Sequence, residues 1–265
     1  MGFISNRIAV VSTSLWERIR YGLPEVNGTV ADEVLFVLDG VGGFQFAPLL
    51  IRRALRLEGS TLPTVLFHWQ FCLPGEIWTD LMWYRRNRLM GLMLARRLLA
   101  FRRAHPKTRI HLLAYSGGAG VGVFACEKLK ARGLIDTLVL ACPALSPTYN
   151  LGPALLAVKQ CYALVSHKDR WLLGLGTRIF GTTDRRFTAA AGMRGFEIPT
   201  TASTQDRQAY ERMREIRWGP ELKKTKHHGG HTGWVMVGFL RTHLLAILKA
   251  EPLLAVSRVK PAPGA

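Results

Sequence analysis

Acidic side chains are scarce in this sequence of 265 residues, where 18 Asp and Glu stand against 36 Lys and Arg and leave a formal net charge of +18. The stretch from residue 81 to residue 126 contains no acidic residue at all. A charge excess of this size favours anionic neighbours such as lipid headgroups, acidic substrates or nucleic acid. Charge alone does not choose among these partners.

Cysteine is also sparse, and its spacing argues against two common roles. The four cysteines form neither a CxxC pair nor a zinc-finger pattern: Cys72, Cys126, Cys142 and Cys161. Three of them lie in apolar runs, where a buried free thiol is the default interpretation. The histidines of "HHGGH" at 227–231 would hold zinc only if a carboxylate joined them, and no HExxH is present. We therefore expect neither a disulfide framework nor a metal or other cofactor.

Long apolar runs are missing as well. The opening "MGFISNRIAVVSTSLWERIR" is too polar for a signal peptide, and no stretch reaches the length of a membrane span. The myristoylation pattern fails because position 6 is Asn. We expect a cytoplasmic protein with one domain over residues 1–255 and a frayed tail over residues 256–265.

Short apolar segments alternate with helical patterns along the chain. Five runs are almost free of charge, as buried parallel strands are: 33–40, 64–69, 110–115, 137–142 and 161–166. Helical periodicity follows at 81–104, 117–132 and 233–249, whereas 205–218 fits either a helix or a last strand. This alternation predicts an α/β fold with a mostly parallel central sheet and helices on both faces.

A serine stands between the third run and the second helical pattern, in "HLLAYSGGAGV" at 111–121. The small residues Ala114 and Gly118 flank Ser116 at two positions on either side, as a nucleophile elbow requires. Such a turn exposes the hydroxyl and places the N–H of Gly117 at a helix N-terminus, where it can bind an oxyanion. The alternative is a structural serine in an ordinary strand-to-helix turn.

Other glycine-rich phosphate-binding motifs do not fit this loop. A dinucleotide fingerprint starting at Gly118 would need Gly or Ala at position 123, which is Val. A P-loop would need Gly-Lys followed by Ser or Thr, and the sequence has none.

A nucleophilic serine also needs a base and an acid that orients the base. "HKDRW" places Asp169 just beyond the run at 161–166, and "HHGGHTGW" places His231 in a glycine-rich loop before the last helix. All three residues then lie at the carboxyl edge of the sheet, where ligands of such folds bind. The competing residues are His227 and His228 for the base, and Asp136 and Asp184 for the acid.

Four segments, "LDGVGG", "AYSGG", "SHKDR" and "GGHTGW", resemble the α/β-hydrolase fold family over roughly residues 30 to 250. The resemblance implies a serine hydrolase that cleaves a small-molecule or lipid-like carboxylic ester or thioester, with Ser116, Asp169 and His231 as its triad. It also implies that the N–H of Val41 is the second oxyanion donor beside Gly117. Asp39 stands where the family usually has histidine, and Ala114 where glycine is commonest. Only about 18 residues separate the runs ending at 142 and starting at 161, too few for a large lid domain.

The helical pattern at 81–104 combines basic and apolar residues outside an expected core stripe of Trp83, Met90, Leu94, Leu98 and Phe101. Its arginines are Arg85, Arg86, Arg88, Arg96, Arg97, Arg102 and Arg103, with Leu89, Leu92, Met93 and Leu99 among them. This face is either simply solvated or contacts an anionic membrane or a protein partner. Nucleic acid is disfavoured because no recognition motif is present. The alternative function is therefore a hydrolase-fold module without turnover that binds through this face.

Overall fold

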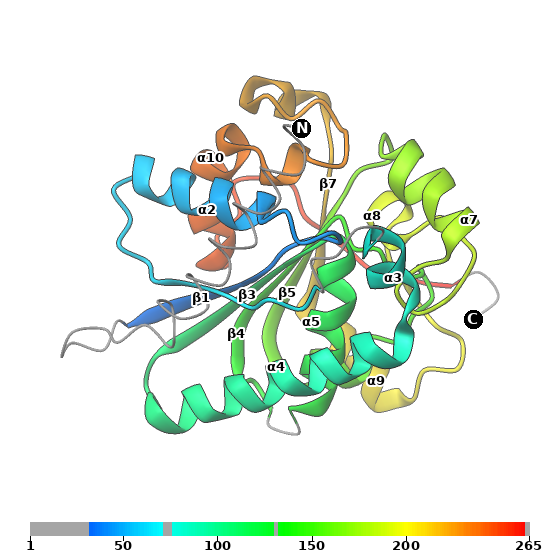
Figure 1. The fold of residues 1–265 in the computed structure, drawn as a ribbon, viewed down its shortest axis with the longest axis horizontal. Coiled ribbons are helices and arrows are strands. Elements are labelled where there is room, and N and C mark those ends of the chain that lie inside the picture. The colour runs from blue at the N-terminus through cyan, green and yellow to red at the C-terminus, as the bar shows by residue number, and fades with distance from the viewer. Residues whose placement is uncertain (1–31, 71–75, 130–131, 263–265) are drawn as a thin grey trace, which may run out of the picture.

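The computed structural model describes residues 32–70, 76–129 and 132–262. Its central sheet has the strand order β2-β1-β3-β4-β5-β7-β8 (Figure 1). The strands are β1 (Glu33–Leu38), β2 (Thr64–Leu66), β3 (Arg109–Tyr115), β4 (Ile135–Ala141), β5 (Val158–Val165), β7 (Met213–Arg217) and β8 (Ser257–Arg258). All neighbours pair in parallel except β8, which runs antiparallel to β7. A small second sheet joins β6 (Glu197–Ile198) to β9 (Lys260–Pro261).

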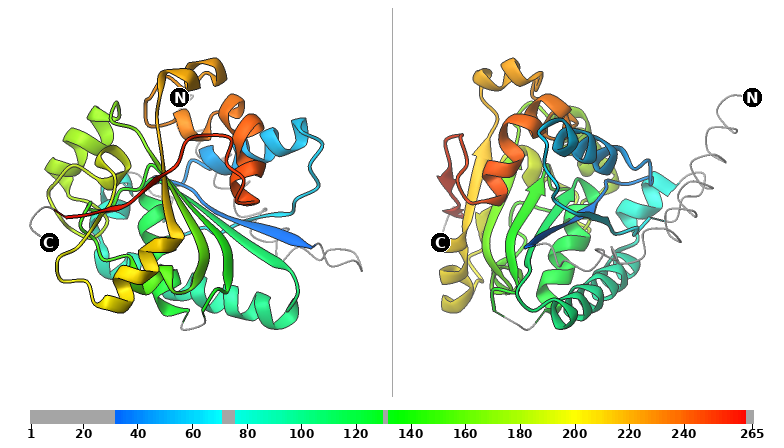
Figure 2. Two further views of the ribbon diagram at one scale, coloured as in Figure 1. Left: turned by 180° about the vertical axis from the view of Figure 1, so that it is seen from behind. Right: turned by 90° about the vertical axis from the view of Figure 1, so that its left-hand side faces the viewer.

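Helices cover both faces of this sheet (Figures 1 and 2). One face carries α2 (Phe46–Leu57) and α10 (Val237–Leu248), and the other carries α4 (Tyr84–Ala104) and α5 (Gly117–Lys128). Shorter elements are α3 (Glu76–Met82), α6 (Gly152–Leu155), η1 (Arg170–Gly176), α7 (Thr177–Phe180), α8 (Ala191–Arg194), α9 (Thr204–Ala209), η2 (Tyr210–Arg212), η3 (Pro220–Thr225) and η4 (Gly233–Val235). The expected α/β fold is confirmed, and the described residues form no large lid domain.

Side chains along each strand point alternately to the two faces of the sheet, so a hydrophobic core forms on each face. Phe36 and Leu38 of β1 pack on the face covered by α4 and α5, whereas Leu35 and Val37 pack on the face covered by α2 and α10. Successive side chains of a strand point to opposite faces, so a strand buried on both faces is apolar throughout. This explains why the five expected strands are such uniform apolar runs. None of the helices in the described ranges is long and apolar enough to cross a membrane.

Three local expectations differ from the structure. Helix α2 has no counterpart in the expected elements, and Trp83, expected on the core stripe of the 81–104 helix, is 53% exposed just before α4. The predicted frayed tail is wrong for the described part of residues 256–265, because β8 pairs with β7 and β9 pairs with β6. Strands β6 and β7 are distant in sequence from this tail, so local composition does not reveal their hydrogen bonds to it. Residues 263–265 lie outside the described ranges.

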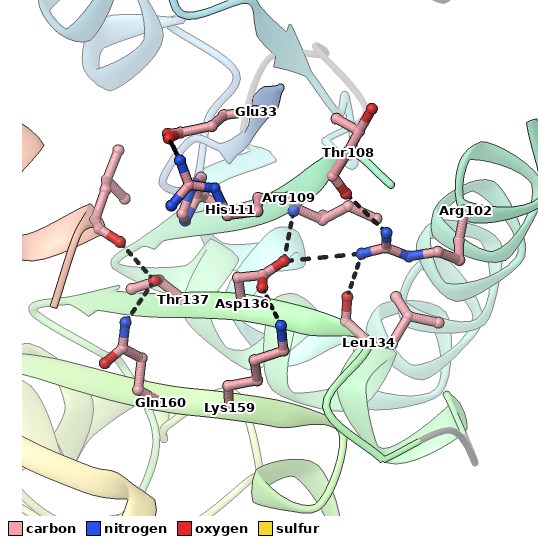
Figure 3. A network of polar contacts seen from close by, with 12 residues as sticks. Glu33, Arg102, Thr108, Arg109, His111, Leu134, Asp136, Thr137, Lys159 and Gln160 are labelled. Carbon is pink, nitrogen blue, oxygen red and sulfur yellow. Dashed lines mark hydrogen bonds and ion pairs between the residues drawn. The ribbon is translucent and has the colours of Figure 1, made fainter. Parts of the chain in front are cut away.

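A polar network ties the amino edge of the sheet to the end of α4 (Figure 3). Asp136, at the start of β4, accepts from the buried Ile110 N–H at 2.9 Å and from Lys159 Nζ at 2.6 Å. Arg102, near the end of α4, donates to the carbonyls of Thr108 and Leu134 at 2.7 and 2.9 Å. Its guanidinium also lies 3.8 Å from Asp136 Oδ2. The network therefore serves the framework at the edge of the sheet opposite Ser116.

We expect Asp136→Ala to lower the free energy of unfolding by about 1–3 kcal/mol, because it leaves the buried Ile110 N–H without its acceptor. Asp136→Asn keeps an acceptor oxygen for that N–H and should lose less. Urea unfolding followed by circular dichroism measures both variants. Equal losses in the two variants would show that the backbone acceptor is not the source of the effect.

Candidate active site

Ser116 occupies a strained turn between β3 and α5, with φ of 53° and ψ of −120°. This left-handed backbone is unusual for a residue with a Cβ and costs of order 1–3 kcal/mol. The surrounding structure holds it in place. Ser116 N–H donates to the Ala141 carbonyl at 2.8 Å, and the Ser116 carbonyl accepts from Ala119 N–H and Ala144 N–H, each at 3.1 Å. The strain expected for a nucleophile elbow is therefore present at this serine.

Small residues around Ser116 allow α5 to approach the sheet closely. A Cβ on Gly118 would lie 2.3 Å from the Asp39 carbonyl oxygen, at the end of β1. A Cβ on Gly117 would lie 2.6 Å from Val41 Cγ1, so the residues expected to supply the two oxyanion donors are neighbours. Close packing therefore explains glycine at both positions.

The structure brings Ser116, His231 and Asp169 into one hydrogen-bonded chain. His231 Nε2 lies 2.9 Å from Ser116 Oγ, and His231 Nδ1 lies 2.5 Å from Asp169 Oδ2. Ser116 and Asp169 are buried, with 7% and 4% exposure, and the His231 side chain is 11% exposed. The imidazole thus bridges a hydroxyl and a carboxylate in a nearly water-free setting, where hydrogen bonds between polar groups are strong.

The two oxygens of Asp169 have different partners. Oδ2 contacts His231, whereas Oδ1 accepts from Leu173 N–H at 3.4 Å and so caps the start of η1. The Asp169 N–H donates to the Ser166 carbonyl at 3.1 Å, which ties the residue to the end of β5. The carboxylate is therefore oriented by the segments on both sides of it.

Three side chains for which the sequence predicts no role at the site hold the loop of His231. Ser166 Oγ donates to the Gly229 carbonyl at 2.6 Å, and Trp218 Nε1 donates to the His227 carbonyl at 2.9 Å. Cys142 Sγ contacts the His231 carbonyl at 3.2 Å. Each follows a different strand, and each fixes a carbonyl of the loop, so the imidazole is placed by anchors from three strands.

The residues that competed for the base and acid positions have other environments. His227 is buried against Trp234 with ring centroids 4.3 Å apart, and His228 is exposed. Asp184 accepts from Ser146 Oγ and Thr182 Oγ1 at 2.5 and 2.6 Å. Asp136 belongs to the amino-edge network described above. None of the four is hydrogen-bonded to Ser116 or His231 in the described contacts.

Histidine clustering does not produce a metal site in the structure. Across residues 32–70, 76–129 and 132–262, no group of three His, Cys, Asp or Glu side chains is placed to hold a metal ion. His227 is buried, His228 is exposed, and His231 contacts Ser116 and Asp169.

The turn after β1 is held in place at Asp39, Gly40 and Gly42. Trp69 Nε1 donates to the Asp39 carbonyl at 2.8 Å, and Gln70 Nε2 donates to the Gly40 carbonyl at 2.6 Å. The next contact is Gly42 N–H to Asp80 Oδ2 at 2.9 Å. In a trans peptide the carbonyl and the following N–H point in opposite directions. The contact of Gln70 therefore directs the N–H of Val41 away from Gln70.

Asp39 has a structural role at the start of α2. Its carboxylate accepts from Phe46 N–H at 2.9 Å and Ala47 N–H at 3.1 Å, so it caps the start of α2. Burial raises the pKa of Asp39, and these backbone hydrogen bonds oppose that shift. Capping of free N–H groups by a carboxylate is a favourable contact at a helix N-terminus.

A hollow of about 260 Å³ lies away from the triad. Its lining comes from the end of α2 and the segment that leads into β2: Arg52, Leu55, Arg56, Ser60, Leu62 and Thr64. This is the amino edge of the sheet, because Thr64 pairs with Leu35 near the start of β1. The hollow therefore does not serve Ser116.

Comparisons with known proteins add little to this picture. No protein-family profile and no curated protein matches the chain. Among solved structures it is similar to a 2.75 Å crystal structure of an uncharacterized protein from Bacillus cereus ATCC 10987, with 15% identity and a TM-score of 0.36. The match covers 58% of this chain and about half, 49%, of that protein. A likeness this weak carries no argument about function.

The environment of His227 predicts a pH dependence of stability. Burial lowers the pKa of His227 to about 4, with a smaller effect from His228. Its Nδ1 accepts from Gly229 N–H at 3.1 Å, and a proton on Nδ1 would remove that acceptor. Between about pH 6.5 and pH 4 the unfolded chain binds a proton here and the folded protein does not, so the free energy of unfolding falls as pH is lowered.

In His227→Gln we expect this decrease to be smaller by an amount on the order of 1 kcal/mol between pH 7 and pH 5. Urea unfolding at a series of pH values measures it, and the exposed His167→Gln is the control for loss of a histidine. A wild-type slope in His227→Gln would contradict the assignment.

Proposed function

We propose that the protein is a serine hydrolase that cleaves a carboxylic ester or thioester through an acyl-enzyme intermediate. The observation that carries the proposal is the chain of contacts from Ser116 Oγ to His231 Nε2 at 2.9 Å and from His231 Nδ1 to Asp169 Oδ2 at 2.5 Å. Together with the strained φ of Ser116, this is the arrangement that activates a serine hydroxyl.

In the proposed reaction, Ser116 Oγ attacks the carbonyl carbon while His231 Nε2 takes the hydroxyl proton. Asp169 holds the imidazole in the tautomer with its proton on Nδ1 and stabilises the imidazolium that forms. His231 then gives the proton to the leaving alcohol or thiol, and the acyl group stays on Ser116. Water, deprotonated by His231, attacks the acyl-enzyme and releases the carboxylic acid.

The tetrahedral intermediates carry a negative oxygen that needs donors already in position. Gly117 is the first residue of α5, so its N–H has no acceptor within the helix. The N–H of Val41 belongs to the same peptide as the Gly40 carbonyl, which accepts from Gln70. The closeness of Gly117 to Val41 Cγ1 supports the assignment of these two N–H groups to one oxyanion.

The second candidate function is a binding module without turnover, docked through α4 on an anionic membrane or a protein partner. Leu89 and Met93 of α4 are 55% and 48% exposed, which favours a contact. Three arginines of the helix are bound internally, however. Arg86 pairs with Asp80, Arg88 pairs with Glu127, and Arg102 binds backbone carbonyls. Since fewer cations are available than the sequence predicts, we rank this candidate second.

Labelling with a fluorophosphonate probe tests the proposed nucleophile. The wild-type protein should be labelled, and Ser116→Ala should lose labelling entirely while keeping its fold, because the probe reacts with activated serine hydroxyls. Ser146→Ala is a matched control, since Ser146 is a buried serine bound to Asp184. Failure of the folded wild type to react would refute the proposal and favour the binding module.

Gln70 is expected to act as a positioning residue for the oxyanion donor. Gln70→Met keeps the size of the side chain but cannot donate to the Gly40 carbonyl, so kcat for a p-nitrophenyl ester should fall about tenfold or more with little change in KM. Gln160→Met is the matched control, because Gln160 makes a single hydrogen bond of 3.0 Å to Thr137 Oγ1 at the far edge of the sheet. Equal kcat values in the two variants, at equal stability, would remove Gln70 from the mechanism.

A further inference from the structure

The segment directly after Asp169 exposes several large apolar side chains. We call it the 170–187 surface. It comprises five side chains that are each 46–80% exposed: Trp171, Leu172, Leu175, Ile179 and Phe187. They belong to η1, α7 and the segment after α7, and Figure 1 shows α7 beside α3 and α8 beyond the carboxyl ends of the strands. Large apolar side chains gathered in this way are a mark of an interaction surface.

The charge of the same segment is strongly positive. Residues 170–194 contain five arginines and a single acid: Arg170, Arg178, Arg185, Arg186, Arg194 and Asp184. The acid is turned inward, where it accepts from Ser146 and Thr182. Arg170, Arg178 and Arg186 are exposed. The exposed apolar side chains therefore share their segment with positive charge that no acid of the segment neutralises at the surface.

This combination of chemistry favours one occupant. A symmetric contact with a second copy would bring like-charged arginines of the two copies together, which is unfavourable. Nucleic acid would be read by aromatic stacking, whereas three of the five apolar side chains are aliphatic. A lipid surface with anionic headgroups accommodates both the apolar side chains and the arginines. Aliphatic side chains and tryptophan enter the interface, while arginines bind phosphates.

We propose that the 170–187 surface docks the protein on an anionic lipid membrane. Trp171, Leu172 and Ile179 enter the boundary between headgroups and acyl chains, and Arg170 and Arg178 contact lipid phosphates. This docking differs from a contact through α4, and it is measured separately from ester turnover. The membrane then lies next to the segment that begins at Asp169.

The test is co-sedimentation of the full chain with vesicles of phosphatidylcholine alone or mixed with phosphatidylglycerol. Wild type should co-sediment with the mixed vesicles at low salt and dissociate from them at high salt. The double variant Trp171→Ser with Ile179→Ser should bind at least about tenfold more weakly, because two inserted side chains are lost. Arg170→Gln should weaken binding about fivefold. Thermal melts of each variant confirm that the fold is retained.

The matched control is Leu89→Ser with Met93→Ser, which removes two comparably exposed apolar side chains from α4. This variant should bind mixed vesicles as wild type does. The proposal is overturned if wild type does not bind the mixed vesicles, or if the α4 variant loses binding and the Trp171 and Ile179 variant keeps it. It is also overturned if sedimentation of the free protein shows a dimer that the Trp171 and Ile179 variant dissociates.

Discussion

The close approach of α5 to the end of β1 is the constraint on which the rest of the site depends. A Cβ at Gly118 would lie 2.3 Å from the Asp39 carbonyl oxygen, so only glycine lets the helix start at this position. With α5 in place, Ser116 turns through a positive φ, and Gly117 lies against the side chain of Val41. The cost of that strained turn is offset by the hydrogen bonds of Ser116 and by burial of nearly all of α5.

Both loops that complete the site are fixed through their carbonyl groups. Trp69 and Gln70 hold successive carbonyls of the turn after β1, and Trp218 and Ser166 hold carbonyls of the His231 loop. A donor that binds a carbonyl fixes the plane of that peptide. It therefore also fixes the direction of the N–H in the same peptide. Loops can carry catalytic groups with little freedom of movement when their backbone is held in this way.

The sequence predicted the features that depend on neighbouring residues, namely the strands and the turn at Ser116. The five apolar strands were predicted because burial on both faces leaves no polar positions, and the elbow because Ala114 and Gly118 flank Ser116. Contacts between distant residues escaped prediction. Helix α2 has no cap of its own and takes Asp39 as its cap, seven residues before Phe46. Likewise, Arg86 and Arg88 look free along α4 because their acids, Asp80 and Glu127, lie elsewhere in the chain.

Asp169 connects the proposed catalytic and docking surfaces. One oxygen contacts His231 at 2.5 Å, and the other accepts from Leu173 N–H of η1, the segment that carries Trp171 and Leu172. A displacement of η1 relative to β5 would therefore turn the carboxylate at His231 and change how the imidazole faces Ser116. Because η1 is a single exposed π-helical segment, a membrane that held it in one position would also hold the triad in one geometry. Taken together, the two proposals couple docking and activity through one carboxylate.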